Sequence, residues 1–279
     1  MVSMLLKKVW LLCIVMSLAG LIALLLFAFF IEPSSFEVTR HEIHGKLNRP
    51  NLKIVQLSDL HLKKVGNRER TLVDQVLDLQ PDLLVLSGDM IDHAEAMPVL
   101  ADFLNLLSPI PVVAVPGNWE HWSEVNFSIL KTLFETRPNG HFLLNEHWTF
   151  TKGGRSILLT GLDDFTAGQP DLRLLDSVAE ARSLVDVAVL IQHSPGFFES
   201  PDIDRRGNGQ RFDLCLSGHT HGGQVSFWGW APFTPPGSGR FVAGFFDAPM
   251  CRLYVSRGLG TSVLPLRLGS KPEIAAFDL

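Results

Sequence analysis

Side chains that can bind metal ions recur along this chain, each after a short apolar run. They are carboxylates, imidazoles and one carboxamide: Asp59 and His61 in Asp-x-His, Asp89 after Gly88, Asn118 after Gly117, His193, and His219 with His221 in Gly-His-Thr-His. Seven such groups are too many for one ion and suit two divalent ions that share one carboxylate. The chemistry that such a pair supports is hydrolysis by an activated water.

The spacing within two of these clusters predicts how the ligands group. On extended backbone, residues two apart point to the same side of the chain. We therefore expect Asp59 and His61 to reach one ion, and His219 and His221 to behave in the same way. Each short pattern is common alone, so the prediction depends on all of them occurring in this order.

The apolar runs that precede the clusters predict the strands that position them. Strands are expected at 52–57, 82–86, 112–115, 156–160, 187–191 and 212–216, and helices at 68–79, 94–107, 123–134 and 171–183. Alternating strands and helices predict a parallel sheet, with ligands bound beyond the carboxyl ends of its strands. Residues 224–279 are rich in Gly, Pro and short β-prone runs and are expected to form strands and loops.

An uncharged apolar run, Val9–Ile31, lies near the N-terminus and is long enough to cross a bilayer as a helix. It is longer than the apolar core of a signal peptide, so we expect an uncleaved anchor. The expected organisation is a tail at 1–8, the anchor at 9–31, a connecting segment at 32–50 and one domain at 51–279. Lys7 and Lys8 precede the span and Glu32 and Glu37 follow it, which favours a single-pass cell-membrane protein with an extracytoplasmic, periplasmic domain.

The charge and the cysteines exclude some classes of protein. Removing residues 1–31 takes two lysines from a chain of net charge −5 and leaves −7, which disfavours nucleic-acid binding. Three cysteines form no disulfide framework. Cys215 and Cys251 could pair in an exported domain, but we expect two small, unpaired core residues.

In their order and spacing, the clusters resemble the motifs of the calcineurin-like metallophosphoesterases, in particular the YkuE/YaeI-type membrane-associated phosphodiesterase branch. The resemblance covers Leu52 to Leu279 and includes the runs 219–224, 254–260 and 272–274. It implies an α/β fold, a four-layered α/β sandwich with a dinuclear site. One ion would be bound by Asp59, His61, Asp89 and His221, and the other by Asp89, Asn118, His193 and His219. Such mixed donors accept Mn, Fe or Zn.

One position departs from the family motif Gly-Asn-His, because Trp119 follows Asn118. The family histidine helps to protonate the leaving group, which Trp119 cannot do. Either His121 supplies the imidazole and acts with Asn118 in catalysis, or the leaving group needs no acid because it is a phosphate of low pKa. In the second case we expect Trp119 to contact the substrate. The lipid A enzyme that cleaves UDP-2,3-diacylglucosamine is similar here, because it also has a residue other than His in this motif. A third explanation for the missing histidine is that the protein has lost its catalytic activity.

Aromatic residues crowd the stretch 227–246, directly after the Gly-His-Thr-His cluster. We expect them to pack onto the sandwich. The alternative is an apolar surface beside the metal site that grips an acyl chain or dips into the membrane, with Trp228 binding substrate. The pair Asp163-Asp164 is expected to cap the next segment and not to enter the site.

Together these features predict a membrane-anchored, metal-dependent phosphoester hydrolase that cleaves a phosphodiester or pyrophosphate bond in a lipid-linked or membrane-associated substrate. The first alternative is the UDP-2,3-diacylglucosamine pyrophosphatase of lipid A biosynthesis. The second is a catalytically impaired scaffold that keeps its metals. No nucleic acid and no obligate protein partner are expected.

Overall fold

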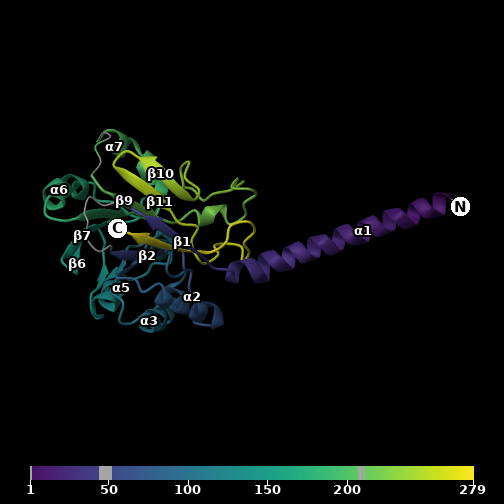
Figure 1. Cartoon of the computed structure of the whole chain (residues 1–279), viewed down its shortest axis with the longest axis horizontal. Coiled ribbons are helices and arrows are strands. Elements are labelled where there is room, and N and C mark those ends of the chain that lie inside the picture. Colours follow the sequence, from purple (N-terminus) through teal and green to yellow (C-terminus); the bar gives the residue numbers. More distant parts are fainter. Residues whose placement is uncertain (1, 44–51, 207–208, 210) are drawn as a thin grey trace.

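The computed structural model describes residues 2–43, 52–206, 209 and 211–279. A long N-terminal helix projects from a domain built on two stacked sheets (Figure 1). In the first sheet the spatial order is β1 (Glu37–Glu42), β12 (Glu273–Asp278), β2 (Lys53–Leu57), β3 (Leu83–Leu86), β4 (Val112–Ala114) and β5 (Gly140–Phe142). Strands β2 to β5 run parallel, as the strand and helix alternation predicts.

The second sheet also has six strands. Their spatial order is β10 (Gly244–Ala248), β11 (Cys251–Val255), β9 (Leu214–Ser217), β8 (Val187–Ile191), β7 (Arg155–Gly161) and β6 (Glu146–Lys152). The central strands are parallel, and the edge strands β6 and β10 are antiparallel to their neighbours. Five of the six expected strands thus match within one residue at each end, and β9 begins two residues late and ends one late.

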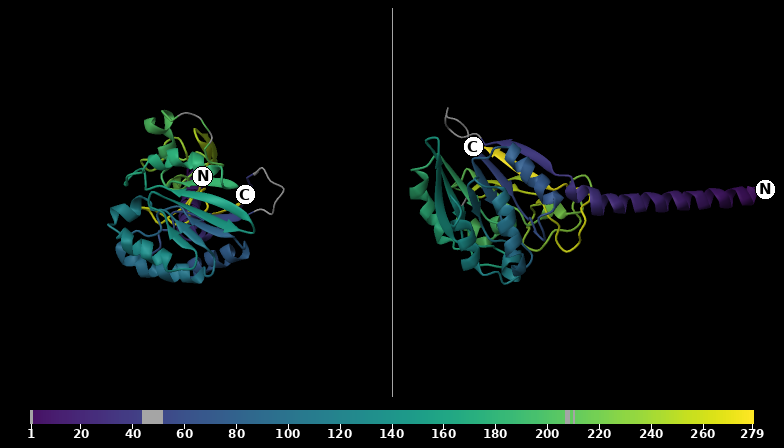
Figure 2. Two further views of the ribbon diagram at one scale, coloured as in Figure 1. Left: turned by 90° about the vertical axis from the view of Figure 1, so that its left-hand side faces the viewer. Right: turned by 90° about the horizontal axis from the view of Figure 1, so that it is seen from below.

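Helices cover the outer face of each sheet and complete four layers (Figure 2). Outside the first sheet lie α2 (Asn67–Asp78), η3 (Ala94–Ala96), α3 (Met97–Leu106) and α5 (Phe127–Glu135), and outside the second lie α6 (Arg173–Arg182), η4 (Pro195–Glu199) and α7 (Pro201–Asp204). The expected helix at 123–134 begins later, at Phe127, because the Asn126 side chain accepts hydrogen bonds from the backbone of Ser128 and Ile129. A separate short helix, α4 (Asn118–Trp122), precedes it.

Alternation along the strands explains the layers. In β3, Leu84 and Leu86 pack under the helices, whereas Leu83 and Val85 pack between the sheets. Because successive side chains point to opposite faces, a strand that is apolar throughout fills two cores at once. Both sheets therefore have both faces covered, and only their ends are free to present polar loops.

The segment after the anchor contributes to the sheet. Strand β1, within the range expected only to connect the anchor to the domain, pairs in parallel with β12 from Glu37↔Glu273 to Glu42↔Asp278. Its polar sequence, Glu-Val-Thr-Arg-His-Glu, suits an edge strand and gives no apolar signal. The rest of that expected segment, residues 44–50, lies outside the described residues.

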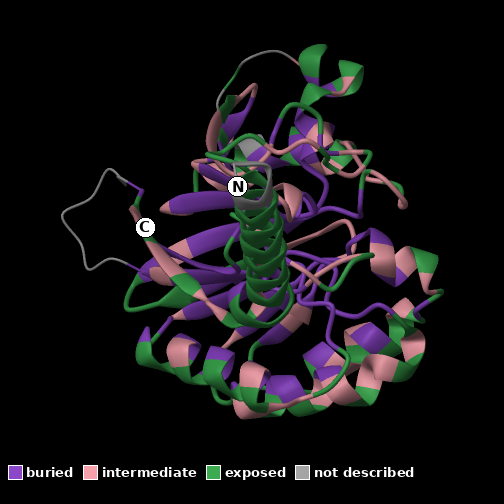
Figure 3. Ribbon diagram, turned by 90° about the vertical axis from the view of Figure 1, so that its right-hand side faces the viewer, coloured by how far each residue is buried: buried purple, intermediate pink, exposed green. Residues whose placement is uncertain are grey.

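The N-terminal helix α1 (Val2–Leu26) continues through a wider π-helical turn, η1 (Phe27–Ile31), and a short 3₁₀ turn, η2 (Glu32–Ser34). Among the described residues, Leu6–Ser34 is the one helical segment long and apolar enough to cross a membrane, and only 6% of its most apolar stretch is buried in the protein. Figure 3, which looks along α1, shows this exposed helix standing over one end of the domain. The segment could therefore anchor the protein in a membrane, as expected.

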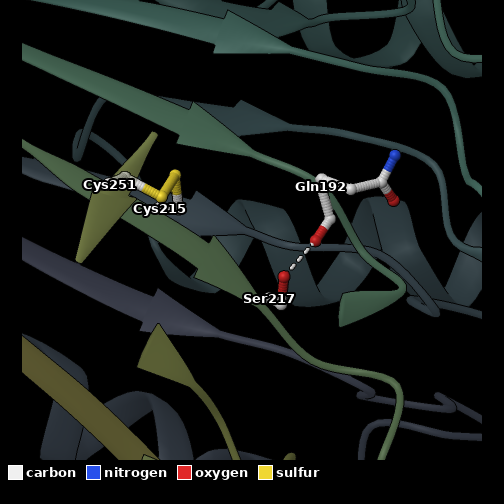
Figure 4. The surroundings of a disulfide bond; sticks show 4 residues. All are labelled: Gln192, Cys215, Ser217 and Cys251. Carbon is white, nitrogen blue, oxygen red and sulfur yellow. Dashed lines mark hydrogen bonds between the residues drawn. A yellow bond between two sulfur atoms is a disulfide. The ribbon is translucent and has the colours of Figure 1, made fainter. Parts of the chain in front are cut away.

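The two body cysteines form a disulfide, so the expectation of unpaired core residues is wrong. Cys215 in β9 and Cys251 in β11 have Cα atoms 5.9 Å apart and are joined through their sulfur atoms (Figure 4). Their strands are neighbours in the sheet, with Cys215 opposite Leu253. A spacing of 36 residues in the sequence does not reveal that adjacency.

Candidate dinuclear metal centre

The candidate metal-binding side chains all lie in the segments that directly follow the carboxyl ends of five strands, and Asn118 is the first residue of α4. Three loops follow β2, β3 and β4 of the first sheet, and two follow β8 and β9 of the second. Because the sheets are stacked, their loops meet at one end of the domain (Figure 1). The structure thus brings together all seven residues expected from the sequence.

Six of these residues form two buried groups. Asp59, His61 and His221 make one group, and Asp89, His193 and His219 make the other, with the ligand atoms within 4.8 Å of one another in each. Oδ1 of Asn118 lies 2.7 Å from Nδ1 of His219 and joins the second group.

Asp89 lies between the two groups. Its Oδ2 is 3.1 Å from Nε2 of His193 in one group and 3.9 Å from Nε2 of His61 in the other. A carboxylate in this position can serve both groups. The grouping agrees with the ligand sets that the family resemblance implies, in which Asp89 bridges.

The imidazoles are oriented for coordination by hydrogen bonds on their outer nitrogens. Nδ1 of His193 donates to the carbonyl of Ser87 at 2.7 Å, Nε2 of His219 donates to the carbonyl of Pro236 at 2.8 Å, and Nδ1 of His61 contacts the carboxylate of Asp92. Such outer partners fix the tautomer of metal-binding histidines. The inner nitrogen of His193, Nε2, is buried and makes no hydrogen bond, although Oδ2 of Asp89 lies 3.1 Å away, and two such atoms facing each other fit ligands of one ion.

The backbone at five of these residues is left-handed. Asp59, His61, Asp89, His219 and His221 have φ between 46° and 70°. The expectation of extended backbone is therefore wrong, and the inference that His219 and His221 share one ion is wrong too, since they fall in different groups. Non-glycine residues seldom adopt this conformation, and such strain is concentrated at functional sites.

A glycine packs directly against the second group. Gly88 has φ +97°, and a Cβ atom there would lie 2.5 Å from Nδ1 of His193. No larger residue fits between β3 and that imidazole. Gly88 is thus required both by backbone conformation and by space, whereas Gly117 and Gly218 are required by space alone.

The buried carboxylates and imidazoles of the site form an environment that favours bound cations. Burial lowers the pKa of His193, but the carboxylates of Asp89 and Asp59 outweigh it and hold that pKa well above its ordinary value. At His221, burial and the cationic neighbours His61 and Arg267 hold the pKa well below its ordinary value, so this imidazole stays neutral. Buried carboxylates beside neutral imidazoles are the donor set that divalent transition metals bind.

Glu120 supports the site and was not identified from the sequence. This fully buried carboxylate accepts backbone hydrogen bonds from Asp89, Met90, Ile91 and Gly117, at 2.6–3.2 Å. Burial and nearby Asp89 raise its pKa to about 7. It fixes the loop of Asp89 against the loop of Asn118. Its place three residues after Gly117 is a capping-box signal that could have identified it.

Arg267 is a second supporting residue, and nothing in the sequence marks it. Its guanidinium is fully buried, donates to the carbonyls of Gly260 and Ser270, and has Nη2 3.3 Å from Nδ1 of His221. Burial lowers its pKa to about 9. It ties the loop after β11 to the loop that carries His221.

A cavity of about 400 Å³ opens over the metal-binding residues. Besides Asp89, Asn118, His219 and His221, its lining includes Trp119, Trp122, Gln224, Phe233, Ser262 and Val263. Trp119 also lies edge-on to the ring of His61, at 5.8 Å between centroids. Trp119 therefore lines the cavity, and its contact with a substrate stays a prediction.

Two other expected site residues do not line this cavity. Nε2 of His121 pairs with Oδ1 of Asp163 at 2.6 Å, and its role as a catalytic residue stays a prediction. Trp228 is wholly exposed and borders a separate hollow beside α1, away from the cavity. Asp164 caps the following turn through the backbone of Thr166 and Ala167, as expected.

The aromatic stretch divides into two parts. Phe241 is fully buried, and Phe245 and Phe246 pack against the cores, in agreement with the expectation. The first part differs: Phe227, Trp228, Trp230 and Phe233 are exposed. For these four, the expectation of packing onto the sandwich is wrong. They lie in the segment between η5 (His221–Gly223) and β10, which forms no helix or longer strand.

When bound, two divalent ions would supply positive charge for phosphoryl oxygens and would activate water. The chain itself orients the candidate metal-binding side chains through the hydrogen bonds of their outer nitrogens, at His193 to the carbonyl of Ser87 and at His219 to the carbonyl of Pro236. Trp119 and Trp122, stacked edge to face at 5.7 Å, form an apolar wall beside them. This arrangement can orient a phosphoester and exclude water from one side of it.

Comparisons with known proteins agree with this site. The model of the calcineurin-like phosphoesterase family matches residues 52–223. An uncharacterized metallophosphoesterase of Bacillus subtilis, YkuE, is 32% identical over 270 residues, which is 91% of this chain and 88% of that protein. The phosphodiesterase YaeI of Escherichia coli is 30% identical over 90% of each chain.

A solved structure shows the same fold. A dimetal phosphatase from Danio rerio aligns with 76% of this chain and 88% of its own, with a TM-score of 0.50 and 12% sequence identity.

Proposed function

Since the chain belongs to the calcineurin-like phosphoesterase family and is a metal-dependent phosphoester hydrolase, we propose that it cleaves a phosphodiester bond in a membrane-associated substrate. One observation carries the proposal: the cavity over the metal-binding residues is walled by exposed apolar side chains, Trp122, Phe233 and Val263. A phosphodiester could place its phosphate against the ligands and an apolar substituent along this wall. The name of the YaeI relative, a phosphodiesterase, supports the bond type.

The cavity favours a substrate with a good leaving group. Among the described residues that line it, the only imidazoles are His219 and His221, both expected to bind metal. His121 is held by Asp163. Without a general acid to protonate the leaving group, the rate of bond cleavage depends on the pKa of that group, and a group of low pKa leaves faster. A lipid-linked pyrophosphate, such as UDP-2,3-diacylglucosamine, is therefore the second candidate.

Trp119→His is expected to broaden the range of leaving groups. An imidazole here would enter the cavity and could protonate an alkoxide, which should raise kcat/KM for an alkyl phosphodiester roughly tenfold, a modest share of what general acids contribute. Cleavage of bis(p-nitrophenyl) phosphate, whose leaving group needs no acid, should stay nearly constant. Both rates are measured on the full chain in detergent with Mn²⁺.

Trp122→His is the matched control, because Trp122 lines the same cavity from a more exposed position. It should change both rates by the same factor, because it alters the apolar wall without bringing an acid to the leaving group. A wild-type enzyme that cleaves alkyl and aryl diesters equally fast would contradict the argument from the leaving group. Failure to cleave any diester, combined with hydrolysis of a lipid-linked pyrophosphate, would favour the second candidate.

We also propose that the domain lies outside the cytoplasm. The disulfide Cys215–Cys251 supports this side, since such bonds persist in oxidising compartments. It joins β9 to β11, while Oγ of Ser217 donates to the carbonyl of Gln192 at the end of β8 (Figure 4). Strand β9, which leads into the segment with His219, is thus linked to β11 by the disulfide and to the end of β8 by a hydrogen bond.

Loss of the disulfide is expected to destabilise the domain by about 2–4 kcal/mol. Cys215→Ser with Cys251→Ser should show this in denaturant unfolding, and reductant should destabilise the wild type but not the variant. Thiol titration of unreduced, denatured protein from cells should find only Cys13. Three free thiols would instead indicate a cytoplasmic domain.

A further inference from the structure

Exposed apolar side chains are concentrated in two loops near the cavity. Eleven large hydrophobic residues are exposed among the described residues after Ile31, and six of them lie in residues 224–243 and 258–271. We call these six the apolar lip: Phe227, Trp228, Trp230, Phe233, Val263 and Leu264. The exposed fractions of Phe233 and Val263 are 82% and 90%. A patch of this kind on a protein surface marks an interaction site.

The apolar lip lies against the N-terminal helix. Phe227 and Trp228 border a hollow of about 270 Å³ together with Leu24 of α1. The backbone N–H of Arg267 donates to the carbonyl of Ala28 at 2.9 Å, so the second loop is joined to the same helix. Figures 1 and 2 show both loops at the base of α1.

The position of Leu24 sets the depth of the apolar lip in a bilayer that α1 crosses. A span needs about 20 apolar residues. If the hydrocarbon layer begins at Val9, it ends near Ala28, and Leu24 lies about 6 Å inside that end at a rise of about 1.5 Å per residue. If the layer extends to Ile31, Leu24 lies deeper. Side chains level with Leu24 therefore reach the acyl region in either case.

The charge around the apolar lip fits a lipid surface. Neither loop contains an aspartate or a glutamate, although the whole chain has a net charge of −5. The charged residues there are the exposed Arg240, which pairs with Glu199, the exposed Lys271 and the buried Arg267. Tryptophan and phenylalanine flanked by cations are typical of segments that bind the membrane interface.

The two loops are joined to the metal site and to each other. The carbonyl of Pro236 accepts from Nε2 of His219, and Nε2 of Gln224 donates to the carbonyl of Leu264 at 2.9 Å. Phe233 and Val263 belong both to the apolar lip and to the cavity lining. The position of the cavity mouth is therefore fixed relative to the apolar lip.

We propose that the apolar lip inserts into the interface of the bilayer that holds α1, so that the cavity opens at the membrane surface. The occupant is lipid, and acyl chains fill the hollow beside Leu24. This proposal rests on the exposure of the apolar side chains, on their position beside Leu24 and on the absence of acidic residues from the two loops. It does not depend on the proposed activity.

The test is fluorescence from labelled single cysteines in the full chain. In a Cys13→Ser background that keeps the disulfide, Trp228→Cys and Phe233→Cys are labelled with the dye NBD and reconstituted in vesicles of phosphatidylcholine and phosphatidylglycerol. Both dyes should show blue-shifted emission. Lipids with a nitroxide in the upper acyl chain should quench them by roughly twofold, as expected for interfacial burial of about 5–10 Å.

Leu184→Cys is the matched control, because Leu184 is 83% exposed and follows α6, at the end of the domain far from α1 (Figure 1). Its dye should be quenched weakly. Equal quenching at residues 184, 228 and 233 would overturn the proposal. Protection of residues 228 and 233 from aqueous iodide without quenching by lipid nitroxides would also overturn it and would indicate that a protein covers the apolar lip.

Discussion

Asp89→Asn is expected to lower kcat/KM for phosphodiester cleavage by roughly 10³-fold or more, a loss of about 4 kcal/mol in transition-state stabilisation. Asp89 lies between the two ligand groups, 3.1 Å from His193 and 3.9 Å from His61. The amide keeps the shape of the side chain but lacks the negative charge that both groups share. The variant should therefore also bind fewer divalent ions, measured by elemental analysis of the purified protein.

The control for this prediction is Asp74→Asn, on the exposed face of α2, which should keep full activity and metal content. Unchanged circular dichroism would show that the Asp89 variant is folded. Wild-type protein that binds two ions but cleaves no phosphoester would support the alternative of a catalytically impaired scaffold. Full turnover by the Asp89 variant would contradict the bridging role.

Gly218→Ala is expected to abolish metal binding and activity by steric exclusion alone. A Cβ atom at this position would lie 1.8 Å from Oγ of Ser58 and 2.4 Å from Oδ2 of Asp59. It would also lie 2.9 Å from Cβ of Ser58, an atom that no change of rotamer moves, so the loops after β2 and β9 must separate. Metal content, activity and the midpoint of thermal unfolding would all fall together.

Gly209→Ala provides the comparison, because a Cβ atom there meets nothing within 4 Å. It should retain activity and stability. Gly218→Ala adds no charge and removes no metal ligand. A loss of metal binding or activity in this variant would therefore be due to the disturbed packing of the two loops. Retained activity would show that the two loops can move apart without releasing the ions.

The ligand set could be predicted from the sequence because its signals are local. Each ligand follows an apolar run, and a buried strand with a polar loop at its carboxyl end can be read within about ten residues. Asp59, His61, Asp89, Asn118, His193, His219 and His221 were all found in this way, and they meet in the structure. Their division between two ions came from the family resemblance and agrees with the two groups.

Other features were missed because their signals are weak or not local. Strand β1 is polar, and its partner β12 lies more than two hundred residues later in the chain. Glu120 is one acidic residue among many until the loops of Asp89 and Gly117 close around its carboxylate. Arg267 is an ordinary cation in sequence and becomes buried only when the loop after β11 packs against the loop that carries His221.

The sequence by itself determined the fold class, the apolar N-terminal helix and the identity of the metal-binding residues, because periodicity and residue type report burial and chemistry along one segment. Only the tertiary structure decided which segments are neighbours. It paired Cys215 with Cys251 by placing β11 beside β9. It separated His219 from His221 through left-handed backbone, and it left Trp228 exposed beside Leu24. Such adjacencies arise from the packing of distant strands and loops, which no local pattern encodes.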